Sequence, residues 1–340
     1  MLSITINTFE KNKKSDKIFI LSFLMMLGIV WTHSRMPRLD MVPDYFYQLS
    51  LFNTIGEDCV APFFLITAFL YYRNYQSGMY WGKLKTRIWS LIVPYILWNA
   101  IGALGWFLVM HFTGDKYISD SQEFTSFVDV VSNIFASKYT VLWYVGVIIV
   151  YALVAPLFYY LAIRKRIAIT AVIFFLLIGI LFHHPYCSPL VWMSIYMMGA
   201  YLGVHYKEYF YKPQPFIITL SALILYPLAF YISQKYEGML VVNFRQWSSV
   251  FFFIGLYDVF DRYIHFLPHR VYKYSFFLYA THYIPLHFLQ RYIIINNPNE
   301  NGCWFAYIVI PFVIVCLCCS LAFVLDKYCH KLYSVLSGNR

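Results

Sequence analysis

Long apolar stretches recur along the whole chain and constrain its fold more than any other feature. A helix needs about 20 mostly apolar residues to cross a bilayer. Stretches of this kind lie near 18–34, 58–72, 88–112, 141–163, 168–183, 190–204, 214–233, 240–257, 272–293 and 303–326. Only 12% of the residues are charged, whereas a soluble protein carries roughly a quarter. The sequence therefore predicts an all-α polytopic membrane protein with about ten transmembrane helices.

The distribution of positive charge predicts how these helices are oriented. Cytoplasmic segments of membrane proteins carry an excess of Lys and Arg. With the N-terminus in the cytoplasm, 19 of the 26 Lys and Arg residues fall in inner segments, and ten of the 16 acids fall outside. Both termini are therefore expected in the cytoplasm. The formal net charge of +10 then reflects orientation in the membrane rather than nucleic-acid binding.

The segments between the helices are too short to form a separate soluble domain. We expect a basic cytoplasmic segment over 1–17, a single membrane domain over 18–333 and a cytoplasmic tail over 334–340. No internal repeat of the kind that many transporters show is visible. The seven cysteines include no pair with metal-ligand spacing, so no metal site is expected.

A histidine lies deep in the stretch near 272–293, in the segment YSFFLYATHYIPLHF. His282 lies about ten residues, or ~15 Å, from the inner end of its helix. Ser275 and Tyr279 precede it by seven and four residues, so the three side chains share one helical face. Polar residues at this depth usually face the bundle interior or a wet cavity. His282 is therefore a candidate catalytic residue, although a hydrogen bond to a neighbouring helix would also explain it.

A second histidine ends the first apolar stretch, and acids enter the membrane from the same outer side. Asp58 could orient the imidazole of His33, which would then act as a general base. The alternatives are an interfacial His33 among lipid headgroups and a loop position for Asp58. Arg245, near the outer end of the stretch at 240–257, either extends to the headgroups or contacts an anionic or sugar ligand.

Six short motifs, in order along the chain, resemble the acyltransferase 3 family of integral membrane proteins. They are LGIVWTHS, VAPFFLITAFLYYR, KLKTRIWSLIVPYILWN, VLWYVGVIIVYALVAP, YMMGAYLGVHY and YKYSFFLYATH. Each motif alone is weakly specific, but together they cover nearly the whole chain. The resemblance implies an enzyme that takes an acyl group from cytoplasmic acyl-CoA and O-acylates a surface polysaccharide or related glycan.

The resemblance also implies roles for particular residues. His33 matches the catalytic histidine that ends the family's first helix, and His282 matches the family's late histidine. Apart from the resemblance, the mechanism that we expect has His282, Tyr279 or Arg245 stabilising the oxyanion, with Ser275 and Asp58 in support. Acyl-CoA, most simply acetyl-CoA, would be a substrate, no cofactor would be bound permanently, and the setting would be a bacterial cytoplasmic membrane.

The chain departs from the family pattern at two places. The arginine that many members carry eleven residues before the first-helix histidine is Ser22 here, and Phe19 replaces an acid three residues earlier. Thr67 and Ala68 replace a Ser-Gly pair in the second helix. Four cations expected on the cytoplasmic side are candidates for binding the CoA phosphates: Lys17, Arg73, Lys85 and Arg87.

Two other classes of function remain open at this point. A transporter or glycan flippase can use intramembrane His and Arg as a proton relay. A non-catalytic family member that supports glycan assembly would explain the departures at Ser22 and Thr67. The oligomeric state cannot be inferred from the sequence.

Overall fold

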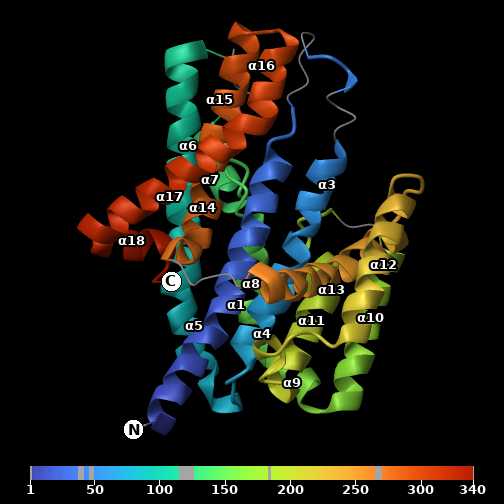
Figure 1. Ribbon diagram of the computed structural model, residues 1–340. Helices are drawn as coiled ribbons and strands as arrows, with labels where there is room; N and C mark the ends of the chain where they lie inside the picture. The colour runs from blue at the N-terminus through green and yellow to red at the C-terminus, as the bar shows by residue number, and fades with distance from the viewer. Residues whose placement is uncertain are drawn as a thin grey trace. The chain divides into compact units, whose positions relative to one another are not determined.

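The computed structural model describes residues 2–36, 42–45, 50–114, 126–182, 185–264 and 270–339. These residues form helices joined by turns, and no strand occurs among them (Figure 1). The expectation of an all-α protein is confirmed.

The helices of the first half are α1 (Leu2–His33), α3 (Ser50–Asp58), α4 (Val60–Tyr72), α5 (Tyr80–Arg87), α6 (Val93–Thr113), α7 (Phe127–Phe135), α8 (Trp143–Leu153) and α9 (Ala155–Ile163). Those of the second half are α10 (Lys165–Leu181), α11 (Pro189–His205), α12 (Phe216–Ser233), α13 (Met239–Ile264), α14 (Ser275–Thr281), α15 (Tyr283–Asn296), α16 (Glu300–Trp304), α17 (Ile310–Tyr328) and α18 (His330–Ser337). Two π turns, η2 (Ile88–Ile92) and η7 (Phe305–Val309), lead into α6 and α17. The 3₁₀ turns are η1 (Ser77–Met79), η5 (Tyr209–Tyr211) and η6 (Arg270–Tyr274).

Several helical segments in the described part of the chain are long and apolar enough to cross a membrane. They are the five segments Asn53–Tyr72, Ser77–Thr113, Phe216–Ser233, Met239–Ile264 and Glu300–Tyr328. A sixth span results if α8 and α9, which are bent by 67°, are counted together. These segments fit an integral membrane protein. The number of ten spans and the cytoplasmic termini remain predictions.

Two of the expected helices are interrupted near a proline. Proline lacks an N–H, and its ring clashes with the carbonyl four residues earlier, so a helix bends or breaks before it. Pro156 lies just after the bend between α8 and α9, and Pro285 lies just after the break between α14 and α15. The span predicted over 272–293 is thus divided into α14 and α15 at His282, whose backbone angles, φ −67° and ψ −31°, remain helical.

The chain divides into two compact units. The first unit contains Met1–Met25, Asp58–Lys83 and Val150–Tyr272, and the second contains Met26–Glu57, Leu84–Ile149 and Lys273–Arg340. The helix α1 contributes its earlier part to the first unit and its end, with His33, to the second.

The first unit is built around the pair α4 and α11. Gly199 permits their close approach, since a Cβ there would lie 2.3 Å from the Leu65 carbonyl oxygen. The rings of Phe64 and Trp192 stack beside this crossing, with centroids 4.7 Å apart. The helices α9, α10 and α13 pack around this pair, and α12 packs on α13.

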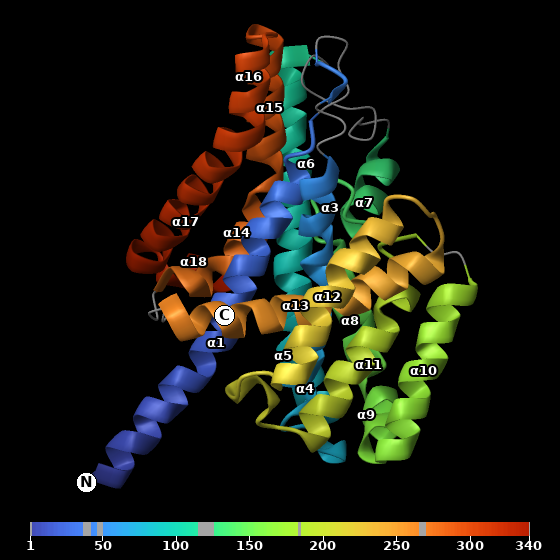
Figure 2. The same cartoon turned by 45° about the vertical axis from the view of Figure 1, so that its right-hand side comes forward.

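The second unit is built from the end of α1 with α3, α6 and α14 to α18. At the crossing of α1 and α3, a Cβ on Gly56 would lie 2.1 Å from Thr32 Oγ1 and 2.2 Å from the Gly28 carbonyl oxygen. In both ribbon views α6, α15 and α16 lie side by side (Figures 1 and 2). This unit holds both histidines that the sequence singles out.

The C-terminal helix α18 packs onto the second unit. Trp98 Nε1 donates a hydrogen bond to the Leu336 carbonyl oxygen at 2.9 Å, and Tyr333 and Ser337 are buried. The tail expected over 334–340 therefore begins inside a packed helix.

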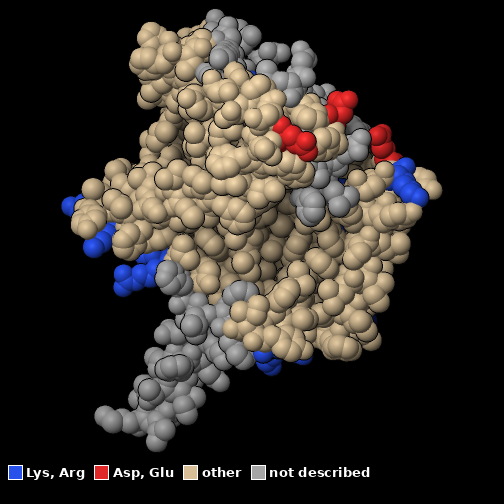
Figure 3. Space-filling model, turned by 45° about the horizontal axis from the view of Figure 1, so that its top comes forward, with Lys and Arg blue, Asp and Glu red and all other residues tan. Residues whose placement is uncertain are grey.

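Uncharged side chains cover most of the face seen in Figure 3, and charged ones form a few separate patches. On α12, Phe216, Ile217 and Ile224 are 74%, 72% and 62% exposed. Such exposure of large apolar side chains along a helix is expected where lipid, not water, is the solvent.

Candidate functional site

His282 is fully buried in the break between α14 and α15. Its Nδ1 lies 3.0 Å from the carbonyl oxygens of both Leu278 and Tyr279. A carbonyl only accepts hydrogen bonds, so Nδ1 must carry the proton. In the neutral ring, Nε2 then holds the lone pair. Nε2 is buried and has no hydrogen-bond partner among the described residues.

His33, the last residue of α1, lies beside His282. The two ring centroids are 5.4 Å apart. The Tyr283 ring meets His33 edge-on at 5.5 Å and His287 at 4.4 Å. We call His33, His282, Tyr283 and His287 the histidine cluster. All four belong to the second unit.

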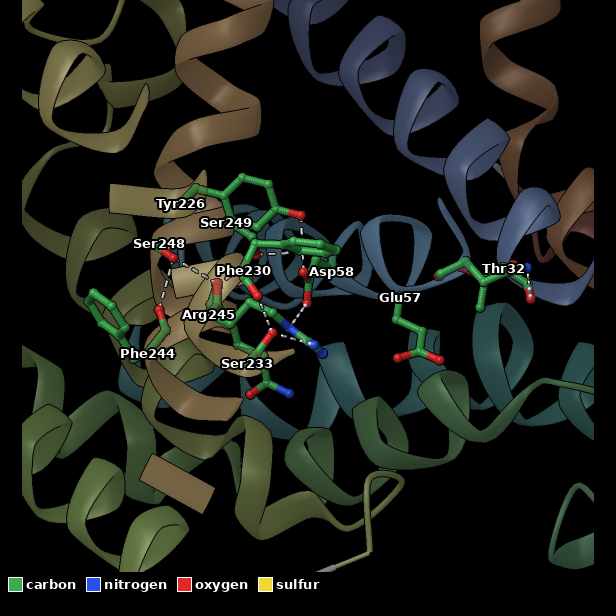
Figure 4. A network of polar contacts seen from close by, with 12 residues as sticks. Thr32, Glu57, Asp58, Tyr226, Phe230, Ser233, Phe244, Arg245, Ser248 and Ser249 are labelled. Carbon is green, nitrogen blue, oxygen red and sulfur yellow. Dashed lines mark hydrogen bonds and ion pairs between the residues drawn. The ribbon is translucent and has the colours of Figure 1, made fainter. Parts of the chain in front are cut away.

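Asp58 takes part in a different set of contacts, within the first unit (Figure 4). Its Oδ1 accepts a hydrogen bond from Arg245 Nε at 3.0 Å, and its Oδ2 accepts one from the Tyr226 hydroxyl at 3.0 Å. Asp58 is 1% exposed and Arg245 8%. A buried charge requires a partner of this kind. Asp58 is therefore neither a loop acid nor, by these contacts, the group that orients His33.

Tyr279 and Arg245, which were expected to support the reaction, have hydrogen-bond partners of their own in the structure. The Tyr279 hydroxyl donates a hydrogen bond to the Val141 carbonyl oxygen, so its proton is already engaged. Arg245 donates to Asp58 and, through a terminal nitrogen, to Ser233 at 3.3 Å. Ser275 begins α14, and the backbone N–H of His282 donates to the Leu278 carbonyl oxygen at the end of that helix, so the helical turn continues from Ser275 to His282.

The four cations expected to meet CoA phosphates differ in their surroundings. Lys17 forms an ion pair with Asp258 at 2.6 Å, and the Arg73 guanidinium lies over the Tyr211 ring at 5.3 Å. Lys85 is exposed and Arg87 half-buried, both in the last turn of α5. Lys17 and Arg73 belong to the first unit and the other two to the second. Within the described residues, no group of His, Cys, Asp or Glu side chains is arranged to hold a metal ion.

Sequence reasoning missed four residues around His33. Tyr283 and His287 complete the histidine cluster, and Asn53 and Gln290 bind the backbone next to His33. Their spacing on α15 was the available signal, because positions 283, 287 and 290 share one helical face. Asn53, in contrast, lies in an unremarkable polar stretch.

These features define a class: an all-helical, apolar protein with two histidines side by side, one of them fully buried. Residues 20–325, nearly the whole chain, match the model of the acyltransferase domain family called acyltransferase 3. The chain belongs to this family, as its six motifs predicted, and is by class a membrane acyltransferase. No curated protein and no solved structure matches it.

Proposed function

We propose that the protein is a membrane O-acyltransferase that moves an acyl group, most simply acetyl, from cytoplasmic acyl-CoA to a sugar hydroxyl of a surface polysaccharide or glycan precursor. Family membership over residues 20–325 supports acyl transfer. The observation that carries the proposal is the pairing of His33 and His282, with ring centroids 5.4 Å apart and with His282 Nε2 buried and unpaired among the residues that the structure describes.

In the proposed reaction His282 is the base. Its Nδ1–H is held by the carbonyl oxygens of Leu278 and Tyr279. Nε2 can therefore take a proton, and the imidazolium that forms keeps its two carbonyl contacts. This proposal exchanges the two roles expected from the sequence, in which His33 is the general base and His282 contacts the oxyanion, because Nε2 of the neutral His282 ring has no proton to donate.

The proposed transfer has two steps, attack on the thioester and departure of the CoA thiolate. The sugar oxygen attacks the thioester carbonyl carbon while its proton passes to His282 Nε2. An N–H of His33 donates a hydrogen bond to the oxyanion, and one such donor is worth ~3 kcal/mol. The C–S bond breaks, and the imidazolium returns its proton to the CoA thiolate. The products are the sugar ester and free CoA, and the neutral His282 is restored.

The donor would approach from the cytoplasmic side. The positive-inside pattern predicts Lys85 and Arg87 on that side, and the exposed ammonium of Lys85 is suited to phosphate. Lys17 is a weaker candidate, because its ion pair with Asp258 must open first. The setting proposed is a bacterial cytoplasmic membrane, with no permanently bound cofactor.

A non-catalytic role in glycan assembly is the second candidate. The replacements at Ser22, Phe19, Thr67 and Ala68 favour it, because they remove a charge pair and a small-residue pair of the family pattern. A transporter predicts substrate movement without covalent change.

The test uses membranes from cells that make the protein, supplied with acetyl-CoA labelled in the acetyl group. Alkali-labile label in glycan is counted for the wild type, for His33→Ala and for the control His111→Ala. His111 is exposed near the end of α6 and lies outside the histidine cluster. All three proteins are compared at equal amounts in the membrane.

We expect label with the wild type and with His111→Ala, and a loss of at least about a hundredfold with His33→Ala. Full label with His33→Ala would refute the assignment of His33. An absence of label in every sample, with glycan present, would favour the non-catalytic role.

A further inference from the structure

The turn that carries His33 is held by two buried amide side chains. The last carbonyl groups of a helix have no partner within it and need one from elsewhere. Asn53 Nδ2, from α3, donates hydrogen bonds to the carbonyl oxygens of Trp31 at 2.9 Å and Thr32 at 3.2 Å. Gln290 Nε2, from α15, donates to the Ser34 carbonyl oxygen at 2.9 Å. The backbone is therefore bound on both sides of His33.

Asn53 is itself fixed in place by other groups. The Tyr307 hydroxyl donates to Asn53 Oδ1 at 3.3 Å. In return, Thr32 Oγ1 donates to the Asn53 carbonyl oxygen at 2.9 Å. Because Oδ1 accepts and Nδ2 donates, only one orientation of the amide satisfies all of these bonds.

Gln290 is fixed by the π turn η7. Its second Nε2 hydrogen bond goes to the Ala306 carbonyl oxygen at 3.2 Å. In a π turn a carbonyl is paired with the N–H five residues later. For Ala306 that residue is Pro311, which has no N–H. The local sequence therefore leaves this carbonyl open for Gln290.

Both amides are buried, each only 1% exposed. A carbonyl that loses its hydrogen bond at such a site becomes an unpaired buried polar group, which destabilises the turn that carries it. Gln290 also lies on the same face of α15 as Tyr283, whose ring contacts the ring of His33. The same helix thus contacts the His33 ring and binds the backbone of the following residue.

We infer that Asn53 and Gln290 are positioning residues of the histidine cluster, which hold His33 opposite His282 by binding the carbonyl groups of Trp31, Thr32 and Ser34. Neither amide touches the reacting atoms. Their effect on catalysis rests on the acyl transfer proposed above, whereas their effect on His33 itself does not.

The experiment replaces each amide by the carboxylate of the same shape. Asn53→Asp and Gln290→Glu keep an acceptor oxygen but lose the N–H groups that hold the turn. Gln290→Met, uncharged and of similar length, provides a variant without a buried charge. The matched control is Asn243→Asp in the first unit: Asn243 is also 1% exposed and donates to two carbonyls, at 3.2 and 2.8 Å.

Two quantities are measured per amount of folded protein. The first is labelled acetyl transfer over a range of acetyl-CoA concentrations. Displacing a catalytic group by about 1 Å costs on the order of a hundredfold. We expect kcat to fall at least about tenfold in the three test variants, with the half-saturating acetyl-CoA concentration unchanged, and to stay near wild type in Asn243→Asp.

The second quantity is the rate at which diethyl pyrocarbonate modifies His33, followed by mass spectrometry without any substrate. We expect this rate to change in the test variants and not in the control. Unchanged modification in all variants, or an equal loss of transfer in Asn243→Asp, would overturn the inference. A wild type that transfers no label while the variants alter His33 reactivity would refute the proposed function and support the positioning role.

Discussion

At the scale of single residues, the chemistry depends on which nitrogen of His282 carries the proton. Two backbone carbonyls, those of Leu278 and Tyr279, settle this question, and no acid is needed. The Leu278 carbonyl also accepts the backbone N–H of His282 at 3.1 Å, so one carbonyl holds both the helical turn and the imidazole.

The first prediction at this scale concerns His282 and His287. His282→Asn removes the proton acceptor, so we expect transfer to fall by roughly 10²- to 10⁴-fold, the range attributed to general base catalysis. His287→Phe keeps a ring against Tyr283, and we expect it to lose less than about tenfold. Labelled acetyl transfer at equal protein level checks both variants.

Either of two results would contradict this ranking. Near-normal transfer by His282→Asn would remove His282 from the chemistry. A larger loss with His287→Phe than with His282→Asn would place the base on α15 instead.

Residue-level reasoning from the sequence found both histidines but not their neighbours. His33 and His282 were visible because a titratable side chain in an apolar stretch is rare. Asp58 was assigned to His33 because both approach the outer side. Instead, Asp58 pairs with Arg245, 187 positions later. This contact depends on how α13 packs, so the spacing of residues near Asp58 could not predict it.

At the scale of elements, the crossing of α1 and α3 determines where His33 lies. Gly56 allows it, because Thr32 Oγ1 and the Gly28 carbonyl occupy the space that a side chain would need. The carbonyl oxygen cannot rotate away as a flexible side chain can. A larger residue therefore has to push the two helices apart.

We accordingly predict that Gly56→Ala lowers the free energy of unfolding by about 1–3 kcal/mol, the usual cost of overpacking. The same variant should lose transfer activity, since α3 also carries Asn53. Gly82→Ala, on α5 with nothing within 4 Å of the new Cβ, is the control. Thermal unfolding in detergent and labelled transfer are measured on both variants, and equal stability of the two would refute the argument.

At the scale of the whole molecule, the number of membrane spans determines which side of the membrane each loop faces. Helix lengths and composition support five spans, or six with the bent pair of α8 and α9. The charge pattern favours ten with both termini inside. The two counts, ten and six, differ by four expected spans. The helices α10 and α11 have 17 residues each, the apolar part of α1 covers only Lys17–His33, and α14 and α15 are separated at His282.

Two exposed cysteines allow this to be tested. The ten-span topology places Cys187 outside and Cys329 in the cytoplasm. In intact cells, a membrane-impermeant maleimide should label a variant that keeps only Cys187 and not one that keeps only Cys329. After permeabilisation both should be labelled. Labelling of Cys329 in intact cells would contradict the topology.

The sequence by itself determined the class of protein. The lengths of the apolar stretches, the distribution of Lys and Arg and the order of the six motifs can all be read without knowing the fold. It also located His33 and His282, since depth follows from the rise of a helix. Only the tertiary structure decided their partners. His33 meets a residue 249 positions away, Asn53 and Gln290 converge on one turn from α3 and α15, and Asp58 turns to Arg245. Each of these contacts depends on which helices lie side by side, and the packing within each unit decides that.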